Sequence, residues 1–490
     1  MEPQYLNWMW LASGPGIEVP PGLQTSAVVV SPAQVKAWIM RSGMVAVVAV
    51  RGRAPRSRTT WTTCSARGPP GPAPSSAGAC IPPDEVCQAA WMLELAIVCV
   101  ASALAWVYLL TAHGGFWLTS QRLPPVTGPL SPRQWPAVAA VVPARNEAKM
   151  LPLTLPALLA QDYPGDFSVT LVDDGSSDGT GRVATALGAC PEGGSPRRAP
   201  LTVVDGRPRP EGWAGKVLAM QQGVEAQRGP GDHGYILFTD ADIEWAPGVL
   251  RDLVTAAERD DRALVSQMAL LRAQAGWEKV VVPAFVYFFA QLFPFKRVND
   301  PRARTAAGAG GCMLIRRAAL AKAGGLERIK GALIDDVALG TLLKRDGNRT
   351  WLGLTTDIRS VRPYPRLADL WQMIARSAYV QLRYSSLLLA GTVVGLLFLY
   401  AAPPAGLLTW IAAAAAGNVT AAALPGAAGL AGLALMSRSY LPMLRLYRLS
   451  PLRAPSLPLI AILYAAMTAD SARRHYSGRT VNWRAHPPRA

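Results

Sequence analysis

The feature that most constrains this chain is an apolar segment at residues 92–112, MLELAIVCVASALAWVYLLTA, which contains a single charged side chain. A hydrocarbon core roughly 30 Å thick is crossed by about 20 apolar residues in a helix, so the segment predicts a transmembrane helix. The chain is apolar again over residues 385–470, with candidate spans near 387–402, 406–423, 426–441 and 457–467. The last two are short or interrupted, so the sequence leaves the number of C-terminal spans open.

Composition agrees with a chain whose partner is a lipid surface. Charged residues make up 17% of the sequence, against roughly 25% in an average soluble domain. The net charge of +17 comes from arginines scattered in the N-terminal region and beside the apolar segments. Because they form no basic stripe interleaved with aromatic residues, no nucleic-acid partner is expected. The arginine-rich segments beside the C-terminal apolar spans are expected on the cytoplasmic side, facing anionic lipid.

The first 91 residues differ from the rest of the chain. Residues 51–80, for example, are rich in Arg, Pro, Gly and Ser and show no helical or strand periodicity, so they cannot bury enough apolar surface to fold. We interpret residues 1–91 as a disordered or non-native extension, with Met92 as a candidate start. A genuine disordered tail is the alternative. Residues 471–490 are expected to form a basic cytoplasmic tail.

Strands and helices are predicted to alternate after a proline-rich linker at residues 113–136. The pattern predicts strands at 138–142, 169–172, 201–204, 235–239 and 263–267, and helices near 151–161, 181–187, 216–227 and 248–259. This alternation is typical of an α/β domain with a mostly parallel sheet covered on both faces. We predict such a domain over residues 137–384.

Polar clusters follow three of the predicted strands, where parallel sheets bind their ligands. They are VVPARNE after the first strand, DDGSSDG at residues 173–179 after the second, and DAD at residues 240–242 after the fourth. Alternate residues of an extended segment face the same way, so Asp240 and Asp242 share one side. Mg²⁺ and Mn²⁺ are held by one or two carboxylates together with substrate phosphates. Each cluster alone is also typical of an ordinary turn.

Two more polar features lie at predicted helix starts. The segment GWAGK at residues 212–216 places a flexible loop, a helix N-terminus and the Lys216 ammonium where a phosphate can bind. Asp335 and Asp336 begin a second helical pattern, VALGTLLKRDG. One of them can simply cap the helix, or one can be a general base whose pKa is tuned by its neighbour and by burial.

In this order and spacing, VVPARNE, DDGSSDG, GWAGK, DAD and IDDVALG resemble family 2 glycosyltransferases. Flanking segments such as GGFWLTSQRLPP, QLRYS and DSARRHYSGRTVNW resemble its hopanoid-associated branch, which is similar to ceramide glucosyltransferases. The resemblance runs from about Met92 to Trp483. It implies a GT-A, Rossmann-like catalytic domain with N- and C-terminal transmembrane helices. It also implies inverting transfer of a hexose from a nucleotide-diphosphate sugar to a lipid hydroxyl, in glycolipid biosynthesis. The multi-pass anchor would lie in a bacterial-type inner membrane, with the catalytic domain cytoplasmic.

Residue by residue, the resemblance implies a nucleotide site and a reaction centre. The nucleotide site would comprise Pro143, Glu147 and Asp174, with Asp173 in support and Lys216 near the diphosphate. A divalent metal, Mg or Mn, would be held by Asp240 and Asp242, with Asp336 as the general base. The acceptor and diphosphate side would comprise Asp335, Gln381, Arg383 and Tyr384.

The chain departs from the family pattern at two places. The family's Glu-Asp pair reads Asp335-Asp336, so the second position remains the candidate base. The processive enzymes' Q-Q/R-x-R-W motif reads VQLRY at residues 380–384, without the leading Gln and the Trp. Processive polymer synthesis is therefore not expected. The alternative functions are a polyprenyl-phosphate sugar transferase and, in a different class, a non-catalytic membrane transporter or scaffold with a degenerate transferase domain.

One apolar segment lies inside the predicted transferase domain. Residues 280–295, VVVPAFVYFFAQLFPF, are too short for a confident span. Aromatic enrichment and the following Lys296 and Arg297 favour a helix lying on the cytoplasmic leaflet, where it would frame an opening for the lipid acceptor. A buried core helix is the alternative.

Overall fold

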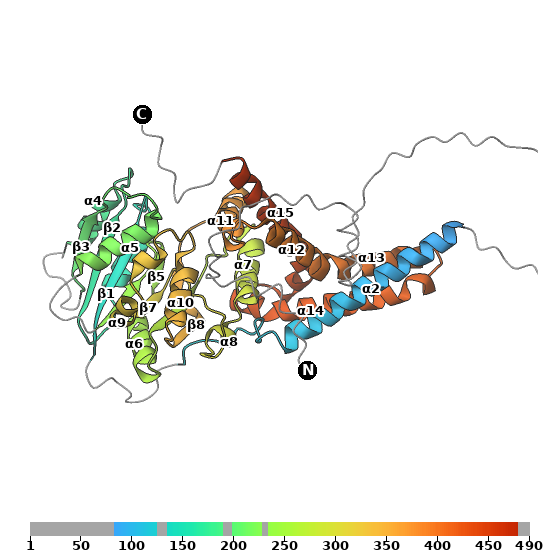
Figure 1. Cartoon of the computed structure of the whole chain (residues 1–490), viewed down its shortest axis with the longest axis horizontal. Coiled ribbons are helices and arrows are strands. Elements are labelled where there is room, and N and C mark those ends of the chain that lie inside the picture. The colour runs from blue at the N-terminus through green and yellow to red at the C-terminus, as the bar shows by residue number, and fades with distance from the viewer. Residues whose placement is uncertain (1–82, 125–134, 190–197, 228–233, 479–490) are drawn as a thin grey trace, which may run out of the picture. The chain divides into compact units, whose positions relative to one another are not determined.

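The computed structural model describes residues 83–124, 135–189, 198–227 and 234–478. Its centre is an eight-stranded sheet in the order β3-β2-β1-β4-β7-β6-β8-β5 (Figure 1). The strands are β1 (Ala137–Ala144), β2 (Phe167–Asp173), β3 (Leu201–Asp205), β4 (Gly234–Phe238), β5 (Ile243–Trp245), β6 (Leu264–Leu270), β7 (Met313–Arg316) and β8 (Thr350–Ser360). Neighbours are parallel except where β7 pairs with β4 and β6 and where β5 pairs with β8.

Helices cover both faces of this sheet. The helices of this part of the chain are α3 (Leu151–Leu159), α4 (Thr180–Gly188), α5 (Gly215–Ala226), α6 (Val249–Arg259), α7 (Glu278–Leu292), α8 (Phe295–Val298), α9 (Arg317–Lys322), η3 (Leu326–Ile329), α10 (Asp335–Arg345) and α11 (Leu367–Gln381). Val138 and Ala140 of β1 pack in one buried cluster with α3, α4 and α6, whereas Val141 packs in another with α5, α9 and α10. Successive strand residues point to opposite faces, so the near-continuous apolar run of β1 serves two cores.

The five strands and four helices predicted from the sequence are all present, and the GT-A-like α/β fold is confirmed. Three strands were missed, namely β5, β7 and β8. Two of them, β5 and β7, introduce the antiparallel pairings. Strand β7 has four residues and β5 has three, which is too short for a period-2 pattern to emerge.

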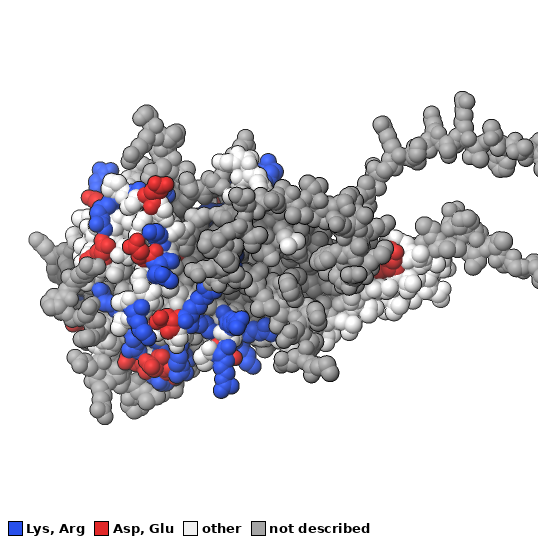
Figure 2. Space-filling model, viewed as in Figure 1, with Lys and Arg blue, Asp and Glu red and all other residues white. Residues whose placement is uncertain are grey.

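Four helical stretches of the described chain are long and apolar enough to cross a membrane. They are Ala89–Thr111, Ser386–Ala415, Thr420–Leu446 and Pro451–Tyr476. The elements that form them are α2 (Pro83–Thr111), α12 (Ser386–Leu396), η4 (Leu397–Ala401), α13 (Ala402–Ala415), η5 (Thr420–Ala422), α14 (Ala423–Leu446), η6 (Pro451–Ser456) and α15 (Leu457–Tyr476). In Figure 2 charged side chains gather over the sheet, whereas the visible part of α2 is almost entirely uncharged.

The C-terminal spans differ from the candidate spans read in the sequence. A break predicted between residues 402 and 406 is absent, because α12, η4 and α13 follow one another without a gap. Proline occupies the first turn of α13 directly after a π-helical turn. In a first turn the missing N–H of proline removes no hydrogen bond within that helix, so the helical stretch can continue. Three C-terminal stretches therefore replace the four candidate segments.

The ends of the described chain also shift the predicted boundaries. Helix α2 begins at Pro83, inside the segment 1–91 assigned to an extension, and α15 continues to Tyr476, past the expected boundary at residue 470. Residues 1–82 and 479–490 lie outside the described residues, so the predictions of a disordered extension and a basic tail fall largely there.

The apolar segment at residues 280–295 forms α7 and the start of α8, and its surroundings favour the core alternative. Tyr287 is fully buried, and its hydroxyl lies 2.6 Å from the hydroxyl of Ser439 in α14. Phe288 packs edge-on against Tyr400 and Tyr464, with ring centroids 5.6 and 4.8 Å apart. The prediction of an interfacial helix was wrong, because aromatic side chains from η4, α14 and α15 cover the surface that was assigned to lipid.

Candidate active site

The predicted site residues gather beyond the carboxyl ends of β1, β2 and β4. In the sheet, β4 lies on the opposite side of β1 from β2 and β3, and ligands of open α/β sheets bind at such a reversal of strand order. Pro143 lies near the end of β1, in register with Val172 of β2. Glu147 follows β1 and is 7% exposed, and its backbone N–H donates to the Thr180 hydroxyl at 2.8 Å.

The loop after β2 is shaped by its own first carboxylate. Asp173 accepts hydrogen bonds from the backbone N–H of Ser176 at 2.9 Å and of Gly181 at 3.0 Å. Gly179 adopts a left-handed φ of 85° just before α4, a conformation that glycine reaches without steric cost. Asp174 faces the other way and pairs with Arg145 at 3.2 Å. Asp173 therefore stabilises the loop, whereas the role of Asp174 in nucleotide binding stays a prediction.

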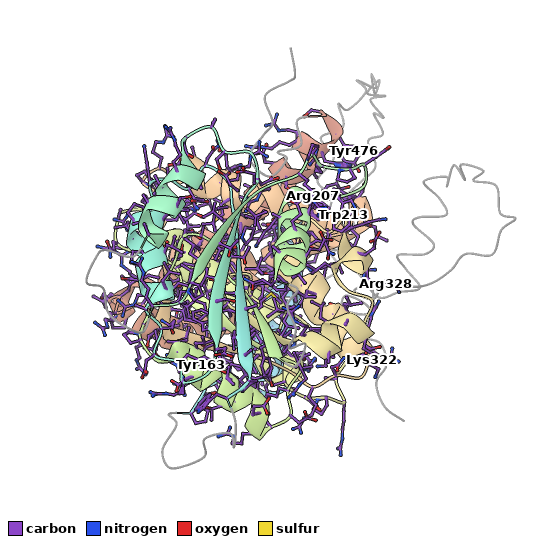
Figure 3. The ribbon with its side chains drawn as sticks, turned by 90° about the vertical axis from the view of Figure 1, so that its left-hand side faces the viewer. Tyr163, Arg207, Trp213, Lys322, Arg328 and Tyr476 are labelled. Atoms are coloured by element: carbon purple, nitrogen blue, oxygen red, sulfur yellow. The ribbon has the colours of Figure 1, made fainter. Side chains whose placement is uncertain are left out.

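Lys216 begins the next cluster, at the first turn of α5. The preceding loop carries Trp213, labelled in Figure 3. The Lys216 Nζ atom lies 2.8 Å from Asp240 Oδ1 and 3.1 Å from Asp335 Oδ2. Burial alone would lower the pKa of Lys216, but the charges of Asp240 and Asp335 raise it above its ordinary value. The ammonium therefore stays charged and joins the end of β4 to the start of α10.

Asp336 is the second carboxylate at the start of α10. Its Oδ2 accepts from the Gly310 backbone N–H at 3.0 Å, and its Oδ1 accepts from Val337 at 2.8 Å. Partial burial, followed by the neighbouring charge of Asp335, raises the pKa of Asp336 to about 6, although Lys216 and both backbone donors lower it. A base that titrates near physiological pH suits proton abstraction.

Gly310 marks where these side chains converge. A Cβ atom at this glycine would lie 3.1 Å from Lys216 Nζ, 3.5 Å from Asp240 Oδ2 and 3.6 Å from Asp336 Oδ2. Three charged groups thus border one small space, and the absence of a side chain at residue 310 keeps that space open.

Arg362 forms a second network that the sequence did not reveal. Its Nη2 lies 2.6 and 2.8 Å from the two oxygens of Glu147, and its Nε lies 2.8 Å from Asp242 Oδ2. The Ser360 hydroxyl donates to the same Asp242 oxygen at 3.1 Å. Burial lowers the pKa of Arg362, but Asp242 and Glu147 more than offset this and raise it. Arg362 therefore bridges the predicted nucleotide and metal residues.

No local signal could have found Arg362. It lies in VRPYP, just after β8, and β8 itself was missed. Its partners are 215 and 120 residues away in sequence. Such a contact follows only from the pairing of β5 with β8, which brings the end of β8 beside the Asp240–Asp242 segment.

The two predicted metal ligands leave room for a hard cation. Asp240 Oδ1 and Asp242 Oδ2 take part in the ion pairs above, and Asp240 Oδ2 borders the open space at Gly310. Within the described chain no three His, Cys, Asp or Glu side chains form a ready metal group. Two carboxylate oxygens completed by substrate phosphates fit Mg²⁺ or Mn²⁺, which bind in this way.

The three predicted acceptor-side residues after α11 lie apart from this cluster. Gln381 ends α11, and Arg383 and Tyr384 have left-handed φ angles of 52° and 57°. The Tyr384 ring stacks on His475 of α15, with centroids 4.5 Å apart. Burial, and then the charge of Arg345, lowers the pKa of Arg383. Arg345 ends the helix that Asp335 begins, so Arg383 lies toward the far end of α10 from the carboxylates.

Comparison with known proteins identifies the central part of the chain. Residues 139–324 match the family model described as glycosyl transferase family 2. That segment contains Glu147, Lys216, Asp240 and Asp242, but it ends before Asp336.

Two relatives are glycosyltransferases by name. A 4,4'-diaponeurosporenoate glycosyltransferase of Staphylococcus aureus (strain USA300) is 36% identical over 108 residues, which is 22% of this chain and 24% of that protein. An N-acetylglucosaminyltransferase of Mesorhizobium japonicum is 37% identical over 83 residues, covering 16% and 19%. The matched segments thus span a quarter or less of these relatives.

A solved structure is also similar to the chain. The mannosyltransferase PcManGT from Pyrobaculum calidifontis, in complex with GDP-Man and Mn²⁺, is 22% identical and covers 79% of this chain and 99% of its own, with a TM-score of 0.48. Together with the family match, the observed sheet leads to one conclusion. Residues 139–324 are similar to glycosyl transferase family 2, and they lie in a domain with a GT-A-like α/β fold.

Proposed function

We propose that this chain is an inverting, metal-dependent glycosyltransferase that moves a hexose from a nucleotide-diphosphate sugar to a hydroxyl group of a membrane lipid. The observation that carries the proposal is the convergence of Lys216, Asp240 and Asp336 around Gly310. A cation, a metal-type carboxylate and a base of raised pKa at one point are what transfer from a diphosphate requires.

In the proposed reaction, Asp336 takes the proton of the acceptor hydroxyl while the acceptor oxygen attacks the anomeric carbon. The bond from that carbon to the diphosphate oxygen breaks, and the diphosphate leaves with the electron pair. A single displacement inverts the configuration at the anomeric carbon, so no protein nucleophile is needed. The Gly310 N–H holds Asp336 Oδ2 in place at 3.0 Å, which orients the carboxylate before the substrate binds.

Donor binding involves both networks. Asp174 and Glu147 are proposed to contact the nucleoside, with Pro143 in the wall of the site, and Lys216 the diphosphate. Asp240 Oδ2 and Asp242 Oδ1 would hold Mg²⁺ or Mn²⁺, which when bound supplies charge neutralisation of the diphosphate. Asp335 would hold Lys216 together with Asp240, through an ion pair of 3.1 Å.

A lipid acceptor is supported by the four candidate membrane helices and by α7, which joins the transferase domain to them. We propose a hopanoid-related lipid, an inner-membrane location and a cytoplasmic catalytic domain. Gln381, Arg383 and Tyr384 would contribute on the acceptor side. A polyprenyl-phosphate acceptor is the alternative, and because a phosphate needs no strong base, Asp336 would then contribute little.

The proposal is tested by incubating membranes containing the chain with a panel of labelled nucleotide sugars and identifying labelled lipids by mass spectrometry. The expected result is one glycosylated lipid whose formation requires a divalent metal and stops with chelator. Full transfer in excess chelator would contradict the metal assignment. A product with a phosphate-linked sugar would favour the polyprenyl-phosphate alternative, and solute uptake without transfer in proteoliposomes would favour a transporter.

A further inference from the structure

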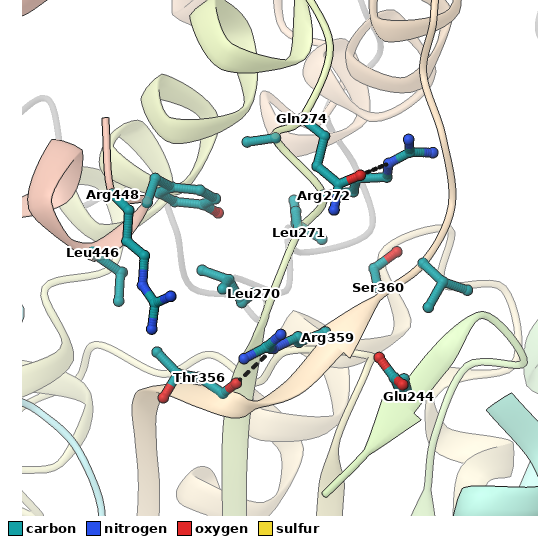
Figure 4. A pocket seen from close by; sticks show the side chains of 13 residues that line it. Glu244, Leu270, Leu271, Arg272, Gln274, Thr356, Arg359, Ser360, Leu446 and Arg448 are labelled. Atoms are coloured by element: carbon teal, nitrogen blue, oxygen red, sulfur yellow. Dashed lines mark hydrogen bonds between the residues drawn. The ribbon is translucent and has the colours of Figure 1, made fainter. Parts of the chain in front are cut away.

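A cavity of about 410 Å³ lies between the end of α14 and one edge of the sheet domain, and its lining does not include Lys216, Asp240 or Asp336 (Figure 4). Its lining residues come from β5, the end of β6, the end of β8 and the end of α14, and comprise Glu244, Leu270, Leu271, Arg272, Ala273, Gln274, Thr356, Arg359, Ser360, Val361, Leu446, Tyr447 and Arg448. The volume falls within the usual range of ligand pockets.

Two guanidinium groups face this cavity. Arg359 and Arg448 point toward one another across it (Figure 4). Arg359 Nε donates to the carbonyl of Thr356 at 3.0 Å, but no carboxylate of a described residue forms an ion pair with either arginine. Like charges that face one another repel, and an anion between them would turn that repulsion into attraction.

The other charged lining residues leave this excess in place. Arg272 turns toward Gln274, to which its Nε donates at 3.2 Å, and lies 3.9 Å from Glu278. Glu244 is the acidic lining residue and lies in register with Arg359 across β5 and β8. Three arginines therefore share the cavity wall with one glutamate, and the cavity has a net positive charge.

Arg448 occupies a backbone position that glycine usually takes at the end of a helix. The N–H groups of Arg448 and Leu449 donate to the carbonyls of Arg445 and Leu444, at 3.0 and 2.9 Å. This is the Schellman arrangement, in which glycine usually occupies the left-handed position just after the helix. Here that position holds Arg448, with a φ of 54°. The chain thus places a guanidinium where a glycine would be less strained.

The position of the cavity and the residues that line it favour a lipid phosphate over a free anion. Helix α14 is part of the candidate span Thr420–Leu446, so the cavity lies where that span ends and where lipid head groups are found. Leu270, Leu271 and Leu446 contribute apolar lining, and Thr356, Ser360 and the arginines contribute polar lining. An amphipathic wall suits a phosphate attached to an apolar chain better than a free ion, and basic pockets beside membrane helices bind anionic head groups.

We propose that this cavity binds a phosphate group presented by the head group of an anionic membrane lipid, with Arg359 and Arg448 as its two charged ligands. The cavity borders the proposed transfer site, because its lining residue Ser360 donates to Asp242 at 3.1 Å. Lipid binding in the cavity does not require that the chain has transferase activity.

The test measures lipid binding by native mass spectrometry on the full-length chain in detergent, with phosphatidylglycerol as the anionic probe and phosphatidylcholine as the neutral probe. Arg448→Gly removes the guanidinium and supplies the residue that the left-handed position favours, so the fold is retained. Arg359→Gln removes the opposite charge. Arg453→Gln is the matched control, because Arg453 lies in η6 just after the same span and outside the cavity lining.

The expected result is that phosphatidylglycerol binds in preference to phosphatidylcholine and that Arg448→Gly and Arg359→Gln each weaken its binding roughly fivefold to tenfold. Arg453→Gln should remain within twofold of the parent chain. Unchanged phosphatidylglycerol binding in both cavity variants would overturn the proposal. A third arm uses inorganic phosphate alone, and Arg448-dependent binding of that ion without binding of phosphatidylglycerol would overturn the lipid source.

Discussion

The two carboxylates of the Asp240-Ala241-Asp242 segment meet different cations. Asp240, whose side chain is 36% exposed, pairs with Lys216 at 2.8 Å. Asp242 is 13% exposed and pairs at 2.8 Å with Arg362, which at the same time holds Glu147. The more exposed carboxylate is thus held by a point charge on a flexible stem, and the less exposed one by a planar fork.

This difference separates two tasks within one site. A partly exposed ion pair contributes roughly 0–1 kcal/mol, so a ligand can replace one of its members. The Lys216 ammonium can therefore exchange Asp240 for a diphosphate. Loss of Arg362 would leave two carboxylates unpaired, Glu147 at 9% and Asp242 at 13% exposure. We infer that Arg362 positions Glu147 and Asp242, whereas Lys216 responds to the donor. Substitutions of Arg362 and Lys216 test this division, and two further predictions test the neighbouring Asp336.

The largest effect is expected for Arg362→Ala. The substitution would leave Glu147 and Asp242 unpaired in a buried place, at a cost of roughly 3 kcal/mol or more. At about 2 °C per kcal/mol in a domain of this size, the apparent Tm of the detergent-purified chain should fall by roughly 6 °C. The measurement is a thermal melt followed by intrinsic fluorescence.

Arg366→Ala is the matched control for this melt. It removes the same side chain four residues further on, where Arg366 is 78% exposed and pairs with Asp369. An exposed pair of this kind should change the Tm by less than about 2 °C. Equal shifts in both variants would contradict the positioning role assigned to Arg362.

The next largest effect concerns Asp336→Asn. Because a general base acts mainly in the transition state, turnover should fall roughly 10²-fold while nucleotide affinity changes little. Asp346→Asn makes the same change at the other end of α10, next to Arg345, and should leave turnover unaltered. A collapse of nucleotide affinity in Asp336→Asn would make Asp336 a donor ligand or a structural residue.

Around Asp336, the sequence predicts the residue types and their place on a helix but not all of their contacts. Asp335 and Asp336 were recognised as a pair at a helix start, and the structure places both there. Their approach to Lys216 and Asp240 joins the start of α10 to the start of α5 and the end of β4, and strand order alone does not predict it. The contact with Gly310 did not follow, because a backbone N–H carries no signature in the sequence.

The fold was predicted where periodicity had room to appear. Strands such as β1 and β4 carry continuous apolar runs, and both were found. The prediction that α7 lies at the membrane interface was wrong because an aromatic run is equally compatible with lipid and with a protein core. Only the side chains that pack against it decide between the two. Those partners, Tyr400, Ser439 and Tyr464, lie more than a hundred residues later in the chain.

The third prediction concerns pH. In the proposed mechanism Asp336 acts as the carboxylate. Its pKa is raised to about 6, so turnover should be level above pH 6 and fall about tenfold per pH unit below it. The charge of Asp335 contributes to that rise, so Asp335→Asn should move the midpoint toward acid. The measurement is kcat against pH for both chains. A midpoint that does not move would show that burial alone sets the pKa.

The smallest expected effect returns to the contrast between Lys216 and Arg362. Without nucleotide, a divalent metal competes with Lys216 for Asp240, so removing the ammonium should strengthen binding of the metal alone. The competing pair is partly exposed and contributes up to about 1 kcal/mol, which corresponds to roughly a fivefold tighter Mn²⁺ affinity in Lys216→Gln. The same variant should bind nucleotide diphosphate more weakly, because the diphosphate loses its cation.

Titration of free Mn²⁺ by electron paramagnetic resonance measures the metal affinity, and nucleotide titration measures the nucleotide affinity. Lys330→Gln, which removes an exposed lysine paired with Glu327, is the control and should change neither. If Mn²⁺ affinity instead fell in Lys216→Gln, Lys216 would be holding Asp240 in its metal-binding position, and the two cations would share one positioning role.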